Sequence, residues 1–134
     1  MTQTAIRQSL ADCKTIAVVG LSPKPHRDSF RVAKYMQDHG FRIVPINPNA
    51  TEVLGEKAYA SLTEAAQHAH IDMVNCFRNS EDIPPIAAEA IAMGAKSLWL
   101  QIGVVNDEAA KQATDAGLVV VQNLCLMVEH RQLG

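Results

Sequence analysis

Residues 15–29, Thr-Ile-Ala-Val-Val-Gly-Leu-Ser-Pro-Lys-Pro-His-Arg-Asp-Ser, decide the fold that we predict for this chain. The stretch starts with an apolar run that ends at Gly20, which is typical of a strand buried on both faces of a parallel sheet. A basic loop with two prolines follows, and a helix is predicted to begin at Asp28 or Ser29. A strand that turns into a helix N-terminus presents free N–H groups and the positive end of the helix dipole, so this stretch predicts an anion site.

The rest of the chain repeats this order of strand and helix, with glycines at the joints. Residues 51–62 stay open between a short edge strand and a loop, and residues 124–132 between a terminal helix and a tail. This order predicts one domain over residues 1–134, an α/β fold with a doubly wound parallel sheet of about five strands and helices on both faces. Strands are predicted at 15–20, 41–46, 71–77, 96–101 and 118–121, and helices at 2–12, 29–39, 63–69, 80–93 and 107–116, with Asp28, Thr63 and Asn106 near helix caps.

Composition restricts the class of protein. The hydrophobic content of 48% and charged content of 19% are ordinary for a globular chain, and a net charge of −2 gives the whole no reason to bind nucleic acid. The N-terminus lacks a secretory signal, and no apolar run reaches the roughly 20 residues of a membrane span, so we expect a cytoplasmic protein without a membrane partner. The three cysteines form no CxxC pair and predict neither a disulfide framework nor a metal site.

Positive charge is concentrated around the opening stretch. Residues 14–42 contain six basic and two acidic residues. Local positive charge on a mildly acidic chain favours a small anionic ligand over a long polyanion. The alternative is that these lysines and arginines are ordinary solvated residues of a helix surface.

Ligands of doubly wound sheets bind at the carboxyl ends of the strands, which here are followed by the loops after Gly20, Ile46, Phe77 and Gln101. In the first loop, hydroxyl and N–H groups can donate to a pyrophosphate, and lysine and arginine can pair with its oxygens. In the second, Asn47 can hydrogen-bond a ribose or a base. The predicted cofactor-binding residues are Gly20, Leu21, Ser22, Pro23, Lys24, Arg27, Ser29, Asn47, Pro48, Phe77, Arg78, Asn79 and Gln101.

The dinucleotide fingerprint G-x-G-x-x-G is absent. Ser22 and Pro25 stand at its later glycine positions, and Asn47 stands where an acidic residue would hold a ribose hydroxyl. These departures disfavour NAD and suit a nucleotide whose ribose already carries a phosphate. Arg78 either pairs with such a ligand or bonds a helix end at the surface, and both interpretations stay open.

No catalytic constellation stands out. Cys125 and His130 could form a thiolate pair, although a small buried cysteine is the simpler interpretation. No nucleophile elbow, zinc-protease motif or P-loop is present. The chain therefore predicts binding and identifies no reaction.

Several segments together resemble the stand-alone CoA-binding domain family, which is similar to the CoA-binding Rossmann domain of the succinyl-CoA synthetase α subunit. The resemblance covers nearly the whole chain, and its residues are specific only as a set. They are Ile16–Ser22 with Pro25 and Arg27, Ser29–Tyr35, Val44–Pro48, Leu54–Gly55, Phe77–Arg78, Trp99–Gln101 with Gly103, and Cys125 with Glu129–Arg131.

The resemblance implies a Rossmann-like fold that holds coenzyme A across the strand ends. The phosphates of CoA would meet residues 20–27, and the adenine would approach residues 47–48 and 77–79. We therefore expect a binding module for CoA or an acyl-CoA, either a homo-oligomer or a partner of an acyl-transfer system. The alternatives are a small nicotinamide-nucleotide-dependent oxidoreductase, a CoA-dependent transferase, or a redox sensor in which Cys125 or Cys76 forms a disulfide with the CoA thiol.

Overall fold

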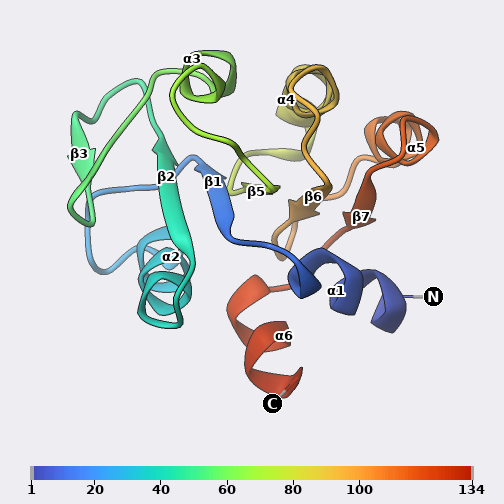
Figure 1. Ribbon diagram of the computed structural model, residues 1–134, viewed down its shortest axis with the longest axis horizontal. Helices are drawn as coiled ribbons and strands as arrows, with labels where there is room; N and C mark the ends of the chain where they lie inside the picture. The colour runs from blue at the N-terminus through green and yellow to red at the C-terminus, as the bar shows by residue number, and fades with distance from the viewer. Residues whose placement is uncertain (1, 134) are drawn as a thin grey trace.

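A five-stranded parallel sheet runs through the middle of the computed structural model, which describes residues 2–133 (Figure 1). The strand order is β2-β1-β5-β6-β7, so the chain reverses direction across the sheet beside β1. This confirms the predicted doubly wound α/β sheet and places its switch point between β1 and β5. The strands are β1 (Thr15–Val19), β2 (Arg42–Ile46), β5 (Met73–Cys76), β6 (Ser97–Leu100) and β7 (Val119–Val121).

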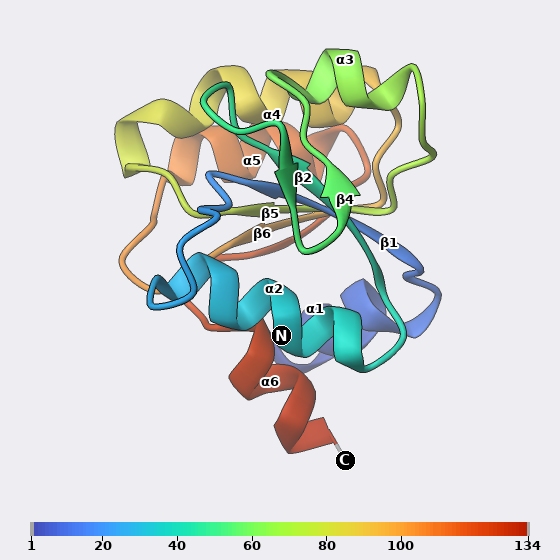
Figure 2. The same cartoon turned by 90° about the vertical axis from the view of Figure 1, so that its left-hand side faces the viewer.

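Helices cover both faces of the sheet, as the edge-on view in Figure 2 shows. One layer contains α1 (Thr2–Ala11), α2 (Asp28–Asp38) and α6 (Leu126–Leu133), and the other contains α3 (Leu62–Ala66), α4 (Ile83–Ala92) and α5 (Asp107–Asp115). A short 3₁₀ turn, η1 (Ser80–Asp82), leads into α4. Among the residues described, no helix has the length and apolar character needed to cross a membrane.

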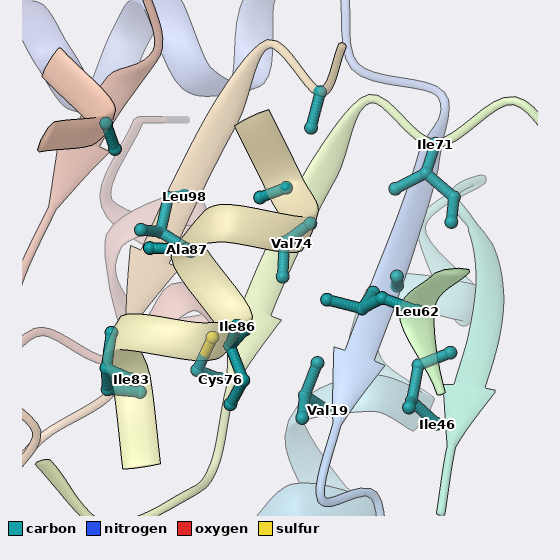
Figure 3. Close-up of a cluster of buried hydrophobic side chains, with 14 of the residues drawn as sticks. Val19, Ile46, Leu62, Ile71, Val74, Cys76, Ile83, Ile86, Ala87 and Leu98 are labelled. Carbon is teal, nitrogen blue, oxygen red and sulfur yellow. The ribbon is translucent and has the colours of Figure 1, made fainter. Parts of the chain in front are cut away.

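Alternate residues of each strand fill two separate cores. Val19 of β1 and Cys76 of β5 point toward α3 and α4, where they meet Leu62 and Ile86 (Figure 3). On the opposite face, the fully buried Trp99 packs with the residues of α1, α2 and α6. Burial of each large apolar side chain contributes about 1.5–3 kcal/mol, so the two cores hold the strand ends, and the loops that follow them, in fixed positions.

Residues 51–62, which the sequence left open between a short edge strand and a loop, contain a small hairpin. Its strands β3 (Glu52–Val53) and β4 (Glu56–Lys57) pair with each other and not with the main sheet. Tyr59 then runs beside the end of β2, where its N–H donates to Pro45 and its carbonyl accepts from Asn47. This segment therefore covers the outer edge of β2 and forms one side of the carboxyl end of the sheet.

Of the three predicted helix caps, Asn106 is confirmed, Thr63 lies near the observed cap, and Asp28 is wrong. The Asn106 side chain accepts a hydrogen bond from the N–H of Ala109, as predicted for the start of α5. At α3 the cap itself is Ser61, whose hydroxyl accepts a hydrogen bond from the N–H of Glu64, and Thr63 lies near it in the first turn of the helix. At α2, Asp28 is already the first helical residue and its carboxylate pairs with Arg31, so it is not free to cap the helix.

A buried carboxylate ties the amino ends of two strands together. Asp72, just before β5, accepts hydrogen bonds from the N–H groups of Lys14 and Thr15 at 2.9 and 3.0 Å. Burial raises the pKa of Asp72, but these two bonds and the charges of His70 and Lys96 outweigh it, and the net pKa lies below its ordinary value. The carboxylate stays ionised and serves as a clamp far from the carboxyl end.

Candidate functional site

Gly20 allows three strand ends to meet. Its N–H donates to Ile46 at the end of β2, and its φ of +86° is a conformation that favours glycine. A Cβ on this residue would lie 2.6 Å from the backbone oxygen of Phe77 and 3.2 Å from Cδ of Arg78. The missing side chain therefore lets the turn after β1 approach the end of β5 closely.

The loop that follows is held by its own hydroxyl groups. The N–H of Ser22 donates to Ser29 Oγ at 3.0 Å, and the N–H of Lys24 donates to Ser22 Oγ at 3.1 Å. From the sequence we expect these N–H groups to donate to phosphate, but the loop itself uses both. Ser22 keeps its own hydroxyl proton for a ligand, whereas the buried Ser29 serves mainly to brace the loop.

The first turn of α2 offers the remaining backbone donors. Its N-cap residue, Arg27, is extended and makes no side-chain hydrogen bond to the helix. The first N–H groups of a helix have no partner within the helix, and no side chain replaces one here. The start of α2 thus combines free N–H groups with the positive end of its dipole, as the sequence predicted.

A basic cleft of about 630 Å³ opens at this helix start. It contains the side chains of Lys24 and Arg27, which are exposed and have no carboxylate partner in the part of the chain that the structure describes. The one carboxylate, that of Asp28, pairs with Arg31. The cleft is lined by Gly20, Ser22, Lys24, His26, Arg27, Asp28, Ser29 and Phe77.

A second cleft, of about 610 Å³, lies across the ends of β1, β2 and β5 and shares Gly20 and Phe77 with the basic cleft. One wall comes from the turn after β2, and the other from α4. In contrast to the basic cleft, it carries several carboxylates. Its lining residues are Val19, Gly20, Ile46–Asn49, Ala60–Leu62, Phe77, Arg78, Glu81, Asp82, Pro85, Ile86 and Glu89.

Asn47 lines this second cleft, but its side chain is already engaged. Its Nδ2 donates to the carbonyl of Leu21 at 3.0 Å, and its Oδ1 accepts from the N–H of Asn49 at 2.8 Å. These bonds fix the β2 turn against the β1 loop. Asn47 and Pro48 therefore shape the cleft wall, and Leu21 is buried beneath it with its carbonyl toward Asn47.

Arg78 lines the second cleft beside Gly20, which both clefts share. Its Cδ lies over Gly20, while its Nη2 is 3.5 Å from the carboxylate of Asp82 one helical turn further on. This separation is long for an ion pair, and 48% of the Arg78 side chain is exposed. The stem is thus packed in place, and the guanidinium remains able to turn.

The structure does not bring Asn79 and Gln101 into either cleft. Asn79 is exposed at the start of η1. Gln101 is buried, and its Oε1 accepts a hydrogen bond from the N–H of Leu126 at the start of α6. Its buried amide holds a helix end, which explains why a polar residue follows β6. Pro23 is exposed in the β1 loop and lines neither cleft.

The cysteine and histidine side chains do not form the thiolate pair considered from the sequence. His130 Nδ1 lies 2.9 Å from the hydroxyl of Tyr35, and its ring packs against Phe41 and His39. Burial, followed by the charge of His39, lowers the pKa of His130. Burial also raises the pKa of the Cys76 thiol to about 12, which disfavours a thiolate at the end of β5.

Sequence reasoning missed the far wall of the second cleft. Glu89 reaches it from α4, and the N–H and hydroxyl of Thr63 both donate to its Oε1. Nothing local in the sequence of α4 marks Glu89, because its position depends on how α3 packs against α4.

Comparison with known proteins gives a family match. A sequence model described as a CoA binding domain matches residues 14–131. The chain is 45% identical over 125 residues to the uncharacterized protein YneT of Bacillus subtilis, covering 93% of this chain and 91% of that protein.

Two further comparisons extend the match. A hypothetical protein from Pyrococcus horikoshii OT3 has a solved structure that superimposes with a TM-score of 0.92 at 41% identity, covering 100% of this chain and 94% of that one. The chain is also 28% identical over 102 residues to an ADP-forming acetate–CoA ligase II of Archaeoglobus fulgidus. That alignment covers 75% of this chain but 15% of the ligase, so it corresponds to one part of a much longer protein.

Proposed function

The chain belongs to the CoA binding domain family, and from this premise we propose that it binds coenzyme A with its diphosphate in the basic cleft. The observation that carries the proposal is the pair of unpartnered cations, Lys24 and Arg27, beside the uncapped start of α2. Phosphate is the anion that suits a helix N-terminus with adjacent cationic side chains. The Ser22 hydroxyl adds a neutral donor to the same cleft.

The second cleft supports the rest of this proposal. It continues from the basic cleft past Gly20 and Phe77, and its volume suits a small organic group. Asn47 and Pro48 give it a rigid wall against which an adenosine would lie. We extend the proposal to acyl-CoA, because a ligand held by its phosphates and nucleoside leaves its thiol end free to carry an acyl group.

Calorimetric titration with CoA tests the proposal. Lys24→Ala and Arg27→Ala should each weaken CoA about tenfold, which corresponds to the loss of a charge-assisted hydrogen bond. The matched control is Arg42→Ala, which removes an exposed cation at the opposite, amino end of the sheet and should change CoA affinity less than twofold. Absence of CoA binding, or an equal effect of all three substitutions, would refute the proposal.

The identity of the nucleotide is tested in the same titrations. NADH has a diphosphate but no phosphate on its ribose, and the residue that would hold its ribose hydroxyls is replaced by Asn47. We expect CoA to bind and NADH to bind much more weakly. NADH affinity equal to or above that of CoA would instead favour the nicotinamide oxidoreductase.

The proposal also includes a cytoplasmic location and a homo-oligomeric state. All three cysteines are free thiols, which suits the reducing cytoplasm that the sequence predicted. We also propose a homo-oligomer, since Ile102 and Val105 in the loop after β6 expose 69% and 42% of their surface. Sedimentation velocity at micromolar concentration should give a mass above the 14.5 kDa of one chain, and a monomer would contradict this part.

A further inference from the structure

We propose that Arg78 is the residue that selects a ligand with an additional phosphate on its ribose, and that Asp82 restrains it until that phosphate arrives. The inference rests on the proposed function and names the part of the ligand that the second cleft recognises. The class of ligand is a nucleotide that carries a ribose phosphomonoester as well as a diphosphate.

The second cleft carries more negative than positive charge. Among the residues that line it, Arg78 is the one cation, whereas Glu81, Asp82 and Glu89 are carboxylates. The Glu89 carboxylate is fixed by two hydrogen bonds from Thr63, so it stays in the wall. A phosphate that entered this cleft would be repelled by the carboxylates unless a cation paired with it.

Arg78 lies where the two clefts meet. Its stem packs over Gly20, on the wall that both clefts share, so its guanidinium can reach a ligand that crosses from one cleft to the other. The diphosphate uses the start of α2, Lys24 and Arg27, and these groups lie on the basic side. The remaining phosphate of such a ligand falls on the other side of the wall, where Arg78 is the available partner.

Asp82 holds Arg78 only weakly. Its carboxylate lies 3.5 Å from Arg78 Nη2, a weak and half-exposed ion pair that costs little to break. A phosphate presents several oxygens and about two charges, so it binds a guanidinium more strongly than this single carboxylate does. The guanidinium therefore exchanges the carboxylate for phosphate. A ligand without the additional phosphate gives it no reason to move.

Affinities for CoA and dephospho-CoA, which lacks the ribose phosphate, test the exchange. Arg78→Ala should weaken CoA at least tenfold and dephospho-CoA less than twofold, and Arg78→Lys should restore part of the loss because it keeps the charge. Asp82→Asn should tighten CoA about three- to fivefold by releasing Arg78. The charge-matched variant Glu81→Gln removes a carboxylate of the same cleft that does not pair with Arg78, and should tighten CoA less than Asp82→Asn does.

The outcomes distinguish the role of Asp82, the selection by Arg78 and the binding of CoA itself. Equal tightening by Asp82→Asn and Glu81→Gln would overturn the role of Asp82, since net charge alone would explain it. Equal weakening of both ligands by Arg78→Ala, or equal affinity of the unaltered protein for both ligands, would overturn selection by Arg78 while leaving CoA binding intact. Failure of both ligands to bind the unaltered protein would refute the proposed function itself. Thermal unfolding of each variant checks that it is folded, and Asp82 makes no side-chain cap bond whose loss would affect α4.

Discussion

Replacement of Gly20 by alanine should destabilise the fold and weaken the site together. An L-residue held at a φ of +86° costs about 1–2 kcal/mol. The added methyl would also lie 2.6 Å from the backbone oxygen of Phe77, which cannot rotate away as a side chain would. Such overpacking costs about 1–3 kcal/mol more, so we expect Gly20→Ala to lower the free energy of unfolding by about 2–5 kcal/mol.

Gly94→Ala separates the two contributions. Gly94 also has a positive φ, +76°, but a Cβ there would have no atom within 4 Å. This control should therefore lose only the conformational part, about 1–2 kcal/mol. Urea denaturation of both variants measures the difference, and CoA titration should show weakening in Gly20→Ala alone. Equal losses of unfolding free energy would refute the argument that close approach to Phe77 fixes the turn.

Three further predictions concern titratable groups. Asp72→Asn should lower the free energy of unfolding by about 1–3 kcal/mol at neutral pH, because it removes the carboxylate that binds two N–H groups. The folded pKa of Asp72 lies below its unfolded value of about 3.9, so this contribution is lost as pH falls through the folded pKa. The urea midpoints of the variant and the parent should therefore converge at that pH. His130→Gln should flatten the thermal-stability profile on the acid side, since the lowered folded pKa of His130 makes the parent lose stability as pH falls below about 6.5, with no effect above it. Alkylation near about pH 8 followed by mass spectrometry should modify Cys125 before Cys76, whose buried thiol has a pKa of about 12; equal rates would contradict its burial.

The sheet was predictable because its signals are local. Each strand is a short apolar run, each joint carries a glycine, and the amide of Asn106 marks a helix start within a few residues. The local signal is less sharp at the other two caps, because several polar residues there are neighbours in the chain and compete for one cap position. Ser61 is the cap of α3, and at α2 the carboxylate of Asp28 pairs with Arg31 and does not cap the helix.

The positions of the candidate site residues were predictable only where these residues follow one another in the chain. Lys24 and Arg27 lie beside the start of α2 because the loop between them and the helix is short. Gln101 also follows a strand, yet its side chain turns inward to the N–H of Leu126, a partner that is distant in sequence. The carboxylate of Glu89 enters through the packing of two helices, which no local pattern encodes.

The departures from the dinucleotide fingerprint are parts of a different turn. At position 47 an NAD site would need a carboxylate, but here the residue must donate through Nδ2 to the carbonyl of Leu21 and accept through Oδ1 from Asn49. An aspartate could accept and not donate, and it would set its charge against a carbonyl oxygen. Ser22 likewise replaces a fingerprint glycine because its hydroxyl accepts from the N–H of Lys24. The side chains that replace the NAD motif are therefore the same ones that fix the β1 loop: Asn47 ties it to the turn after β2, and Ser22 braces it from within.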